Sequence, residues 1–296
     1  MPHDKRPSNK PVLAEASGNT FLIFDYLDKE EHNFDENIIR YYHRLYGFEK
    51  IDSCLVLTKA KEQFDSAQVG NPDSTLFMRM YVYEPGDGFC GNGARVVAKY
   101  CFSHYNNIWS RFFIVLDGQL HELLQRGNEY SVEMGKSVYE DLTGDFVKKG
   151  ALDTNGKLIL DGITWYYVNT SEPHLVTFDE IDDKKLINIG DSLNQDMDQF
   201  RIGINLNRVS ILGKSAINAL TFERGINRLT KACGSGSTSC VALAKRLRLI
   251  DDAKKVVVKV RGGYVVVTNE ENKIYLSGPC WVDGIDSIEI HPESKI

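Results

Sequence analysis

The spacing of hydrophobic and polar residues predicts a protein built mainly from short strands, with few long helices. The apolar runs 21–25 and 54–57 are typical of buried strands. Residues 76–83 alternate between apolar and polar side chains, which indicates a strand with one buried face. Apolar side chains at helical spacing over residues 36–45 predict an amphipathic helix.

The same order of elements occurs twice along the chain. In the first half, strands lead to a glycine-rich turn, Cys90-Gly-Asn-Gly-Ala-Arg95, and then to a helical run over residues 96–102. In the second half, strands lead to the turn Cys233-Gly-Ser-Gly-Ser and then to a helical run over residues 241–249. Further strands follow each helix. Self-similarity over half the chain length indicates a duplicated fold.

We therefore predict an α/β protein of the α+β kind with two similar domains. The first is expected to comprise residues 1–137 plus 280–296 and to carry Cys90, and the second to comprise residues 138–279 and to carry Cys233. The last segment is assigned to the first domain because residues 281–290 alternate as a strand that its sheet can accept.

Composition limits the classes of function. The chain has 296 residues, 42% hydrophobic and 26% charged, which is enough to bury a core without metals or disulfides. A formal net charge of −6 argues against nucleic-acid binding. The chain has no apolar run of about eighteen residues, and residues 1–10 lack the apolar core of a signal peptide. We expect a cytoplasmic protein that binds neither nucleic acid nor membranes.

The six cysteines form no CxxC pair, and no histidine lies at a spacing that would complete a zinc site. The sequence therefore predicts neither a disulfide framework nor a metal centre. Cys54, Cys101 and Cys240 lie in apolar segments and are expected to be inert core residues. Cys90 and Cys233 differ, because each stands directly before a Gly-x-Gly turn and a helix.

A cysteine at a helix start lies beside unsatisfied N–H groups and the positive end of the helix dipole. This setting can lower a thiol pKa from about 8.5 to roughly 3.5–7.5, and the glycines leave backbone N–H groups open to a carboxylate. If the two halves face each other, a substrate carbon would lie between two sulfurs. Inverting such a carbon needs a base on one face and an acid on the other. Cys90 and Cys233 are thus predicted to catalyse a racemisation or epimerisation, sharing one proton.

On these residues the sequence resembles the diaminopimelate epimerase family. The main carriers are the turn from Cys90 to Arg95 and the segment Glu223-Arg-Gly with Thr230-x-Ala-Cys-Gly-Ser-Gly. Weaker similarities are Gly18-Asn19, Pro173-His174, Gly262-Gly263 and Gly278. The resemblance implies two pseudo-symmetric domains, each a curled, mostly antiparallel sheet around a central helix, with the active site between them. It also implies catalysis without pyridoxal phosphate or metal.

The resemblance implies roles for individual positions. Cys90 and Cys233 match the acid–base pair, and Asn19 and Glu223 match groups that hold the α-amino and α-carboxylate ends of the substrate. Further substrate-binding positions are the backbone donors Gly91, Asn92, Gly234 and Ser235 and the distal contacts Asn205 and Arg224. His174 matches a histidine near the cleft, and both a catalytic and a purely structural role stay open for it.

Three positions depart from the family pattern where the far end of the substrate would be recognised. Glu172 replaces an asparagine before Pro-His, Tyr81 replaces an asparagine, and Ser53 replaces glutamine or glycine. Glu172 would suit a distal cation and Arg224 a distal carboxylate; alternatively, Glu172 faces solvent.

The best single hypothesis is a diaminopimelate epimerase that converts the LL form to the meso form in lysine or peptidoglycan precursor synthesis. The alternative is a racemase of another amino acid, such as a basic one, on the same fold. A more remote alternative is a non-catalytic binding paralogue, whose expected mark, loss of a cysteine or of Glu223, is not found. The only binding partner expected is a small-molecule substrate, an amino acid, and the oligomeric state is left open, with a homodimer as one option.

Overall fold

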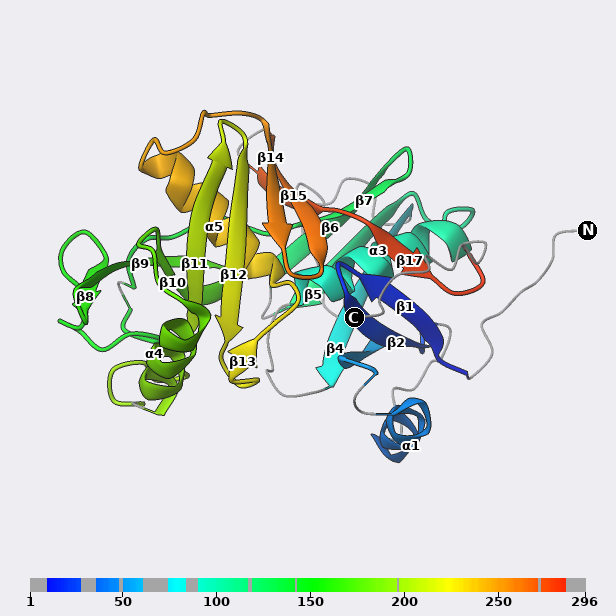
Figure 1. Ribbon diagram of the computed structural model, residues 1–296. Helices are drawn as coiled ribbons and strands as arrows, with labels where there is room; N and C mark the ends of the chain where they lie inside the picture. Colours follow the sequence, from blue (N-terminus) through cyan, green and yellow to red (C-terminus); the bar gives the residue numbers. More distant parts are fainter. Residues whose placement is uncertain are drawn as a thin grey trace, which may run out of the picture.

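A computed structural model describes residues 10–27, 36–47, 50–60, 74–83, 90–116, 119–141, 143–195, 197–270 and 273–285. Two units lie side by side, each a curled sheet around one long helix (Figure 1). The first unit contains β1 (Val12–Ala16), β2 (Asn19–Asp25), α1 (Glu36–Tyr46), β3 (Ser53–Lys59), β4 (Thr75–Tyr83), α3 (Gly91–His104), β5 (Arg111–Leu116), β6 (Gln119–Arg126) and β7 (Glu129–Glu133).

The second unit contains β8 (Lys157–Leu160), β9 (Ile163–Thr170), β10 (Glu172–Thr177), α4 (Asp183–Gln195), β11 (Asn205–Gly213), β12 (Ala216–Glu223), β13 (Arg228–Leu229), α5 (Gly234–Arg246), β14 (Lys255–Val260), β15 (Gly263–Glu270) and β16 (Lys273–Ser277). A short last strand, β17 (Cys280–Val282), returns to the first unit and pairs with β1.

Strand pairing follows the same plan in both units. In the first, β1 pairs antiparallel with β2, β2 parallel with β3 across α1, β3 antiparallel with β4, and β4 parallel with β5 across α3. In the second, β9, β10, β11, β12 and β14 repeat these pairings in the same order, with α4 and α5 as the crossings. Two further antiparallel strands follow in each unit, β6 and β7 in the first and β15 and β16 in the second. The predicted α+β class and the repeated plan are confirmed.

The units are joined where their last strands meet. β7 pairs antiparallel with β16, with Val132 opposite Leu276. The strand predicted over residues 281–290 is described only as far as Val282; a turn follows at residues 283–285, and residues 286–290 lie outside the described part. The domain boundaries at 137/138 and 279/280 stay a prediction.

The helices α3 and α5 form the axes of the two sheets. Most residues of both helices are buried, polar as well as apolar ones, so each helix is enclosed by its sheet. Val96 and Tyr100 of α3 and Val241 and Leu243 of α5 belong to one continuous hydrophobic core that runs through both units. This packing fixes the direction of each helix, and therefore the position of its N-terminus.

The helix α4 packs on the second sheet in a separate core with Trp165, Phe200 and Phe222. The approach is close: a Cβ on Gly190 of α4 would lie 2.4 Å from Cδ1 of Phe222. Only glycine fits there, and Phe222 in turn fixes the end of β12, whose last residue is Glu223.

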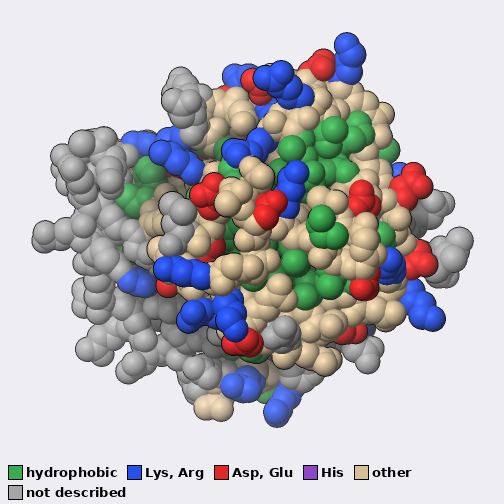
Figure 2. Space-filling model, turned by 90° about the vertical axis from the view of Figure 1, so that its left-hand side faces the viewer, with side chains coloured by type: hydrophobic (Ala, Val, Ile, Leu, Met, Phe, Trp, Pro, Cys, Tyr) green, Lys and Arg blue, Asp and Glu red, His purple; other side chains and the backbone are tan. Residues whose placement is uncertain are grey.

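Charged side chains of both signs are mixed over the face shown in Figure 2, rather than gathered in a patch of one sign. Among the described residues, no helix is both long and apolar enough to cross a membrane.

Candidate active site

Cys90 and Cys233 occupy the same position at the starts of the two central helices. Each is the N-cap residue, with extended backbone, of α3 and α5 respectively. The Sγ of Cys90 accepts a hydrogen bond from the N–H of Gly93 at 3.3 Å, and the Sγ of Cys233 accepts one from Gly236 at 3.4 Å. A side chain that accepts from the third residue of the helix satisfies one of the N–H groups that the helix leaves free.

The first turns of these helices touch each other. A Cβ on Gly234 would lie 3.2 Å from Cα of Gly91 and 2.7 Å from Cδ2 of Leu276. A Cβ on Gly91 would lie 2.9 Å from the same Leu276 atom. Glycine after each cysteine allows this close approach, because a side chain there would displace Leu276 and, at residue 234, also press on the other helix end. The structure thus brings the two cysteines to adjoining helix ends.

Hydrogen bonds across the two units fix the residue before Cys233. The carbonyl oxygen of Ala232 accepts from Nδ2 of Asn92 at 3.0 Å and from Nδ2 of Asn19 at 3.4 Å. Two predicted site residues of the first unit, Asn19 and Asn92, therefore lie against the cysteine loop of the second.

The prediction of low thiol pKa values is wrong in direction. Burial raises the pKa of Cys90 to about 11; the Gly93 N–H group acts to lower it, the Glu223 carboxylate raises it further, and the charge of Arg95 lowers it. Burial and the neighbouring Glu223 carboxylate raise the pKa of Cys233 well above its ordinary value. Removing a thiolate from water destabilises it by more than the N–H groups and the dipole at the helix start stabilise it. Both thiols are therefore protonated at neutral pH.

Glu223 is a carboxyl group whose charge acts on both thiols. It ends β12, and its Oε1 accepts a hydrogen bond from the hydroxyl of Thr230. Burial raises the pKa of Glu223 to about 7, against the lowering effect of that hydrogen bond. A carboxyl group with this pKa is present in both protonation states near neutrality.

His174 reaches Cys233 through a third residue. The Thr221 hydroxyl donates to Oδ1 of Asn207 at 2.8 Å, so Nδ2 of Asn207 faces Nδ1 of His174, 2.9 Å away, and donates to it. Nε2 then carries the ring proton and donates to the Ser235 hydroxyl at 3.0 Å, and this hydroxyl lies 3.4 Å from Sγ of Cys233. Burial lowers the pKa of His174 to about 3, so the ring stays neutral.

Glu172 and Arg224 form a half-buried ion pair. Oε2 of Glu172 lies 2.5 Å from Nη2 of Arg224, and their side chains are 15% and 18% exposed. The alternative in which Glu172 faces solvent is therefore wrong. Both ends of the Asn205 amide bind the backbone beside this pair, at the carbonyl of Pro173 and the N–H of Arg224. Asn205 thus positions the pair.

The other two departures from the family pattern lie in the first unit. Ser53 begins β3, and its hydroxyl donates to the carbonyl oxygen of Asp52 at 2.7 Å. Tyr81 lies in β4 opposite Val56, and its side chain is outside the described part of the structure. No described hydrogen bond joins Ser53 to Glu172 or Arg224.

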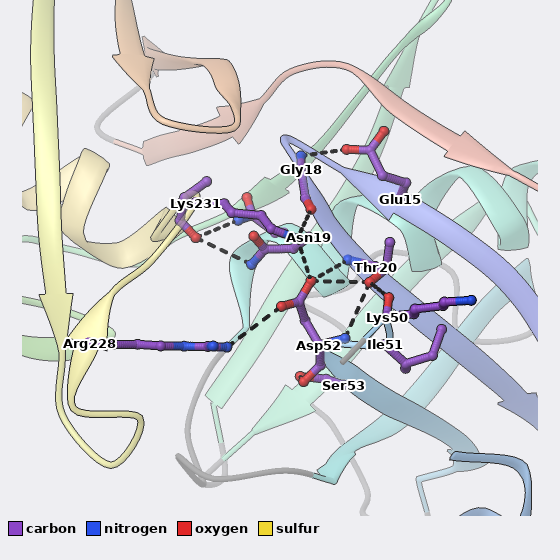
Figure 3. A network of polar contacts seen from close by, with 12 residues as sticks. Glu15, Gly18, Asn19, Thr20, Lys50, Ile51, Asp52, Ser53, Arg228 and Lys231 are labelled. Atoms are coloured by element: carbon purple, nitrogen blue, oxygen red, sulfur yellow. Dashed lines mark hydrogen bonds and ion pairs between the residues drawn. The ribbon is translucent and has the colours of Figure 1, made fainter. Parts of the chain in front are cut away.

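Sequence reasoning missed a polar network that links the units at the start of β2 (Figure 3). Asp52 accepts from the N–H of Thr20 at 2.9 Å and from Nζ of Lys231 at 3.3 Å. Lys231 also donates to the carbonyl oxygen of Gly18 at 2.9 Å, while Arg228 lies 4.0 Å from Asp52. Lys231 stands at the variable position of the Thr-x-Ala-Cys segment, so the pattern gave it no role.

Among the described residues, no group of three or more histidine, cysteine, aspartate or glutamate side chains could hold a metal ion. The groups identified above are two thiols, a carboxyl group with a pKa of about 7 and the N–H groups of two helix starts, which can exchange protons and bind an anion.

The family model for diaminopimelate epimerase matches residues 166–282 of the chain. Diaminopimelate epimerase from Chlorobaculum tepidum is 30% identical over 212 residues, which cover 67% of this chain and 75% of that protein. The enzyme from Thermotoga maritima is 27% identical over 277 residues, covering 89% of this chain and 95% of that protein.

Solved structures show the same fold at low sequence identity. A probable proline racemase from Agrobacterium radiobacter K84 superposes with a TM-score of 0.62 at 11% identity, covering 96% of this chain and 95% of that one. A hydroxyproline epimerase from Agrobacterium vitis superposes with a TM-score of 0.61 at 12% identity, covering 93% of this chain and 90% of that one. The chain is an isomerase of the amino-acid racemase and epimerase class, and it belongs to the diaminopimelate epimerase family.

Proposed function

We propose that the protein is a cofactor-independent diaminopimelate epimerase that converts the LL form to the meso form, for lysine or peptidoglycan precursor synthesis. The observation that carries this proposal is the pair of N-cap cysteines at adjoining helix ends. Two thiols on two facing helix starts supply an acid and a base to opposite faces of one carbon.

In the proposed reaction, the substrate α-carboxylate binds the backbone N–H groups of Gly91, Asn92, Gly234 and Ser235. Asn19 and the Glu223 carboxylate hold the α-amino group. The reacting form of the enzyme has first released one of the two thiol protons to solvent, and the resulting thiolate takes the Cα proton, so that a C–H bond breaks and an S–H bond forms. The other thiol then gives its proton to the opposite face. The negative charge moves from one sulfur to the other, so no further proton donor is needed.

The Glu172–Arg224 pair supports diaminopimelate as the substrate. It presents one carboxylate and one guanidinium group, with no net charge. The far end of diaminopimelate carries one ammonium and one carboxylate group, and therefore matches the pair group for group. Unpaired charges in a half-buried site reduce affinity, which is how such a site rejects an analogue.

The second candidate is a racemase of a basic amino acid, which Glu172 favours because it stands where the family pattern has a neutral asparagine. A basic side chain would satisfy Glu172, but it would bring no carboxylate for Arg224. The two candidates therefore differ at Arg224: diaminopimelate would place a carboxylate beside it, and a basic amino acid would not.

The test is exchange of the Cα hydrogen in deuterated water, followed by NMR for LL- and meso-diaminopimelate, lysine, ornithine and arginine. We expect rapid exchange for diaminopimelate only, and none in the Cys90→Ala/Cys233→Ala double variant. Exchange for a basic amino acid alone would establish the second candidate. If none of these five compounds exchanged its Cα hydrogen, both candidate functions would be contradicted, and the result would favour the non-catalytic binding paralogue.

A further inference from the structure

Arg95 is a fully buried cation in α3, about one helical turn after Cys90. Its Nη2 donates to Oδ1 of Asn92 at 2.7 Å and to Oγ of Ser17 at 3.0 Å, and its Nη1 donates to the carbonyl oxygen of Pro279 at 3.1 Å. Its Nε has no hydrogen-bond partner. All three acceptors are neutral, and no carboxylate among the described residues lies within ion-pair distance of the guanidinium.

A buried charge without a counter-charge is costly, and proteins ordinarily pair such a group. Burial lowers the pKa of Arg95 to about 10, which leaves the group charged at neutral pH. The titratable groups that act on it are Cys280 of β17, Cys90 at the start of α3 and Glu15 of β1. Of these, Glu15 is the one carboxyl group, and Cys90 is a thiol whose pKa burial raises to about 11.

The fold keeps space for this guanidinium. Gly278 has a φ of +155°, and a Cβ there would lie 2.7 Å from Nη1 of Arg95 and 3.2 Å from the carbonyl oxygen of Tyr264. Two features therefore favour glycine at position 278, shortly before the last strand: its positive φ, and the space that the Arg95 guanidinium occupies.

The Arg95 contacts also reach the second cysteine. Asn92, which accepts from Arg95 through Oδ1, donates through Nδ2 to the carbonyl oxygen of Ala232. A continuous chain of hydrogen bonds thus runs from Arg95 to the residue before Cys233.

We propose that Arg95 is a positioning residue of this isomerase, whose fixed positive charge favours the thiolate of Cys90 and whose contact with Asn92 holds the Cys233 loop. This proposal rests on the proposed function of the two cysteines. The Glu223 carboxylate acts to raise the pKa of both thiols, but the charge of Arg95 opposes this at Cys90, whereas Glu172 adds to it at Cys233. Cys90 is then the sulfur that carries the negative charge more readily.

The experiment compares Arg95→Met, which removes the charge, with Arg95→Lys, which keeps it. The rate of alkylation by iodoacetamide is measured at Cys90 and at Cys233 from pH 6 to 11 by peptide mass spectrometry. Glu223 also acts on both thiols and is present in all variants. In Arg95→Met we expect the pKa of Cys90 to rise by about one unit, which removes about nine-tenths of its thiolate at pH 7, with a much smaller change at Cys233.

The same variants are tested for turnover. Arg95→Met should lower kcat about tenfold and leave KM within about threefold, because the thiolate fraction changes and substrate contacts do not. Arg95→Lys should restore most of both the pKa and kcat. The matched control is Lys99→Met, which removes another cation of α3, one turn further along, where Nζ donates to the carbonyl oxygen of Cys280. It should leave the Cys90 titration unchanged.

An unchanged Cys90 titration in Arg95→Met, or an equal shift at both cysteines, would overturn the proposal. If Arg95→Met does not fold, Gly278→Ala replaces it, because the added methyl group displaces the guanidinium and should also raise the pKa of Cys90. The thiol titration needs no substrate, so it decides the role of Arg95 even if the protein fails to exchange any amino acid and the proposed function is wrong.

Discussion

The side-chain amide of Asn92, in the first turn of α3, donates a 3.0 Å hydrogen bond to the carbonyl oxygen of Ala232, the residue before Cys233. This contact joins the start of one central helix to the loop that leads into the other. It places the two cysteines relative to each other by a bond between units, rather than by either unit alone.

Asn92→Ala should therefore reduce turnover by more than its effect on stability explains. The backbone N–H of residue 92 stays in place, but Ala232 and Arg95 each lose a partner, which costs about 1–3 kcal/mol of the free energy of unfolding. The matched control is Asn194→Ala, because Asn194 is another buried amide, and its described hydrogen bonds all join the backbone of the second unit, at Gly190 and Ile204. Urea unfolding and kcat are measured for both. Equal losses of kcat in the two variants would show that the bond from Asn92 to Ala232 does not position the cysteines for catalysis.

Replacing either cysteine by alanine should lower turnover by about a hundredfold or more, since inversion needs proton transfer on both faces. Serine is more informative, because its hydroxyl is a poor base at neutral pH but can still donate a proton. Cys90→Ser and Cys233→Ser should each retain more Cα exchange from one stereoisomer, and the preferred stereoisomer should differ between them. Deuterium uptake from each stereoisomer measures this. Equal loss from both stereoisomers in both variants would mean that the thiols do not act on opposite faces.

The raised pKa of Glu223 predicts that the free energy of unfolding depends on pH. Its pKa is raised from 4.5 to about 7 in the folded protein, so the folded state holds this proton more tightly than the unfolded state does. The stability contributed by the protonated form is fully present below about pH 4.5 and is lost as pH rises through about 7. At about 1.4 kcal/mol per unit, the loss is on the order of 3 kcal/mol.

Glu223→Gln should remove that loss and also reduce activity. We expect the difference in unfolding free energy between pH 4.5 and pH 8 to be smaller in the variant than in the native protein, as measured by urea unfolding. Glu140→Gln, in an exposed position, serves as the control and should keep the native pH dependence. A native-like pH dependence in Glu223→Gln would show that this carboxyl is ionised in the folded state throughout.

Glu172→Gln should alter substrate binding without altering the proton transfers. The change leaves Arg224 without its carboxylate partner and removes the group proposed to hold the distal ammonium of diaminopimelate. We expect KM to rise about tenfold, equivalent to about 1.4 kcal/mol, with kcat nearly unchanged. Asp198→Asn, which breaks the exposed pair with Lys148, is the control and should change neither constant. A fall in kcat at constant KM would assign Glu172 to the chemical step.

The local parts of the site could be predicted from the sequence. Both Cys-Gly-x-Gly turns lie at helix starts, because an N-cap contact joins residues only three positions apart, as between Cys90 and Gly93. The predicted helix over residues 36–45 is confirmed as Glu36–Tyr46, since its period is local as well. The central helices begin earlier than the apolar runs predicted, at Gly91 and Gly234, because burial offsets the low helix propensity of glycine.

The energetics of the site were decided by tertiary structure. The direction of the thiol pKa shifts depends on how deeply two units bury Cys90 and Cys233, and no local pattern contains that depth. The pairing of Glu172 with Arg224 and the burial of Arg95 against Ser17 and Pro279 join residues far apart in the chain. The sequence alone determined which chemical groups the protein carries at its two helix starts. Only the packing of one unit on the other determined their charges and partners, because solvation and Coulomb interactions depend on distance in space rather than along the chain.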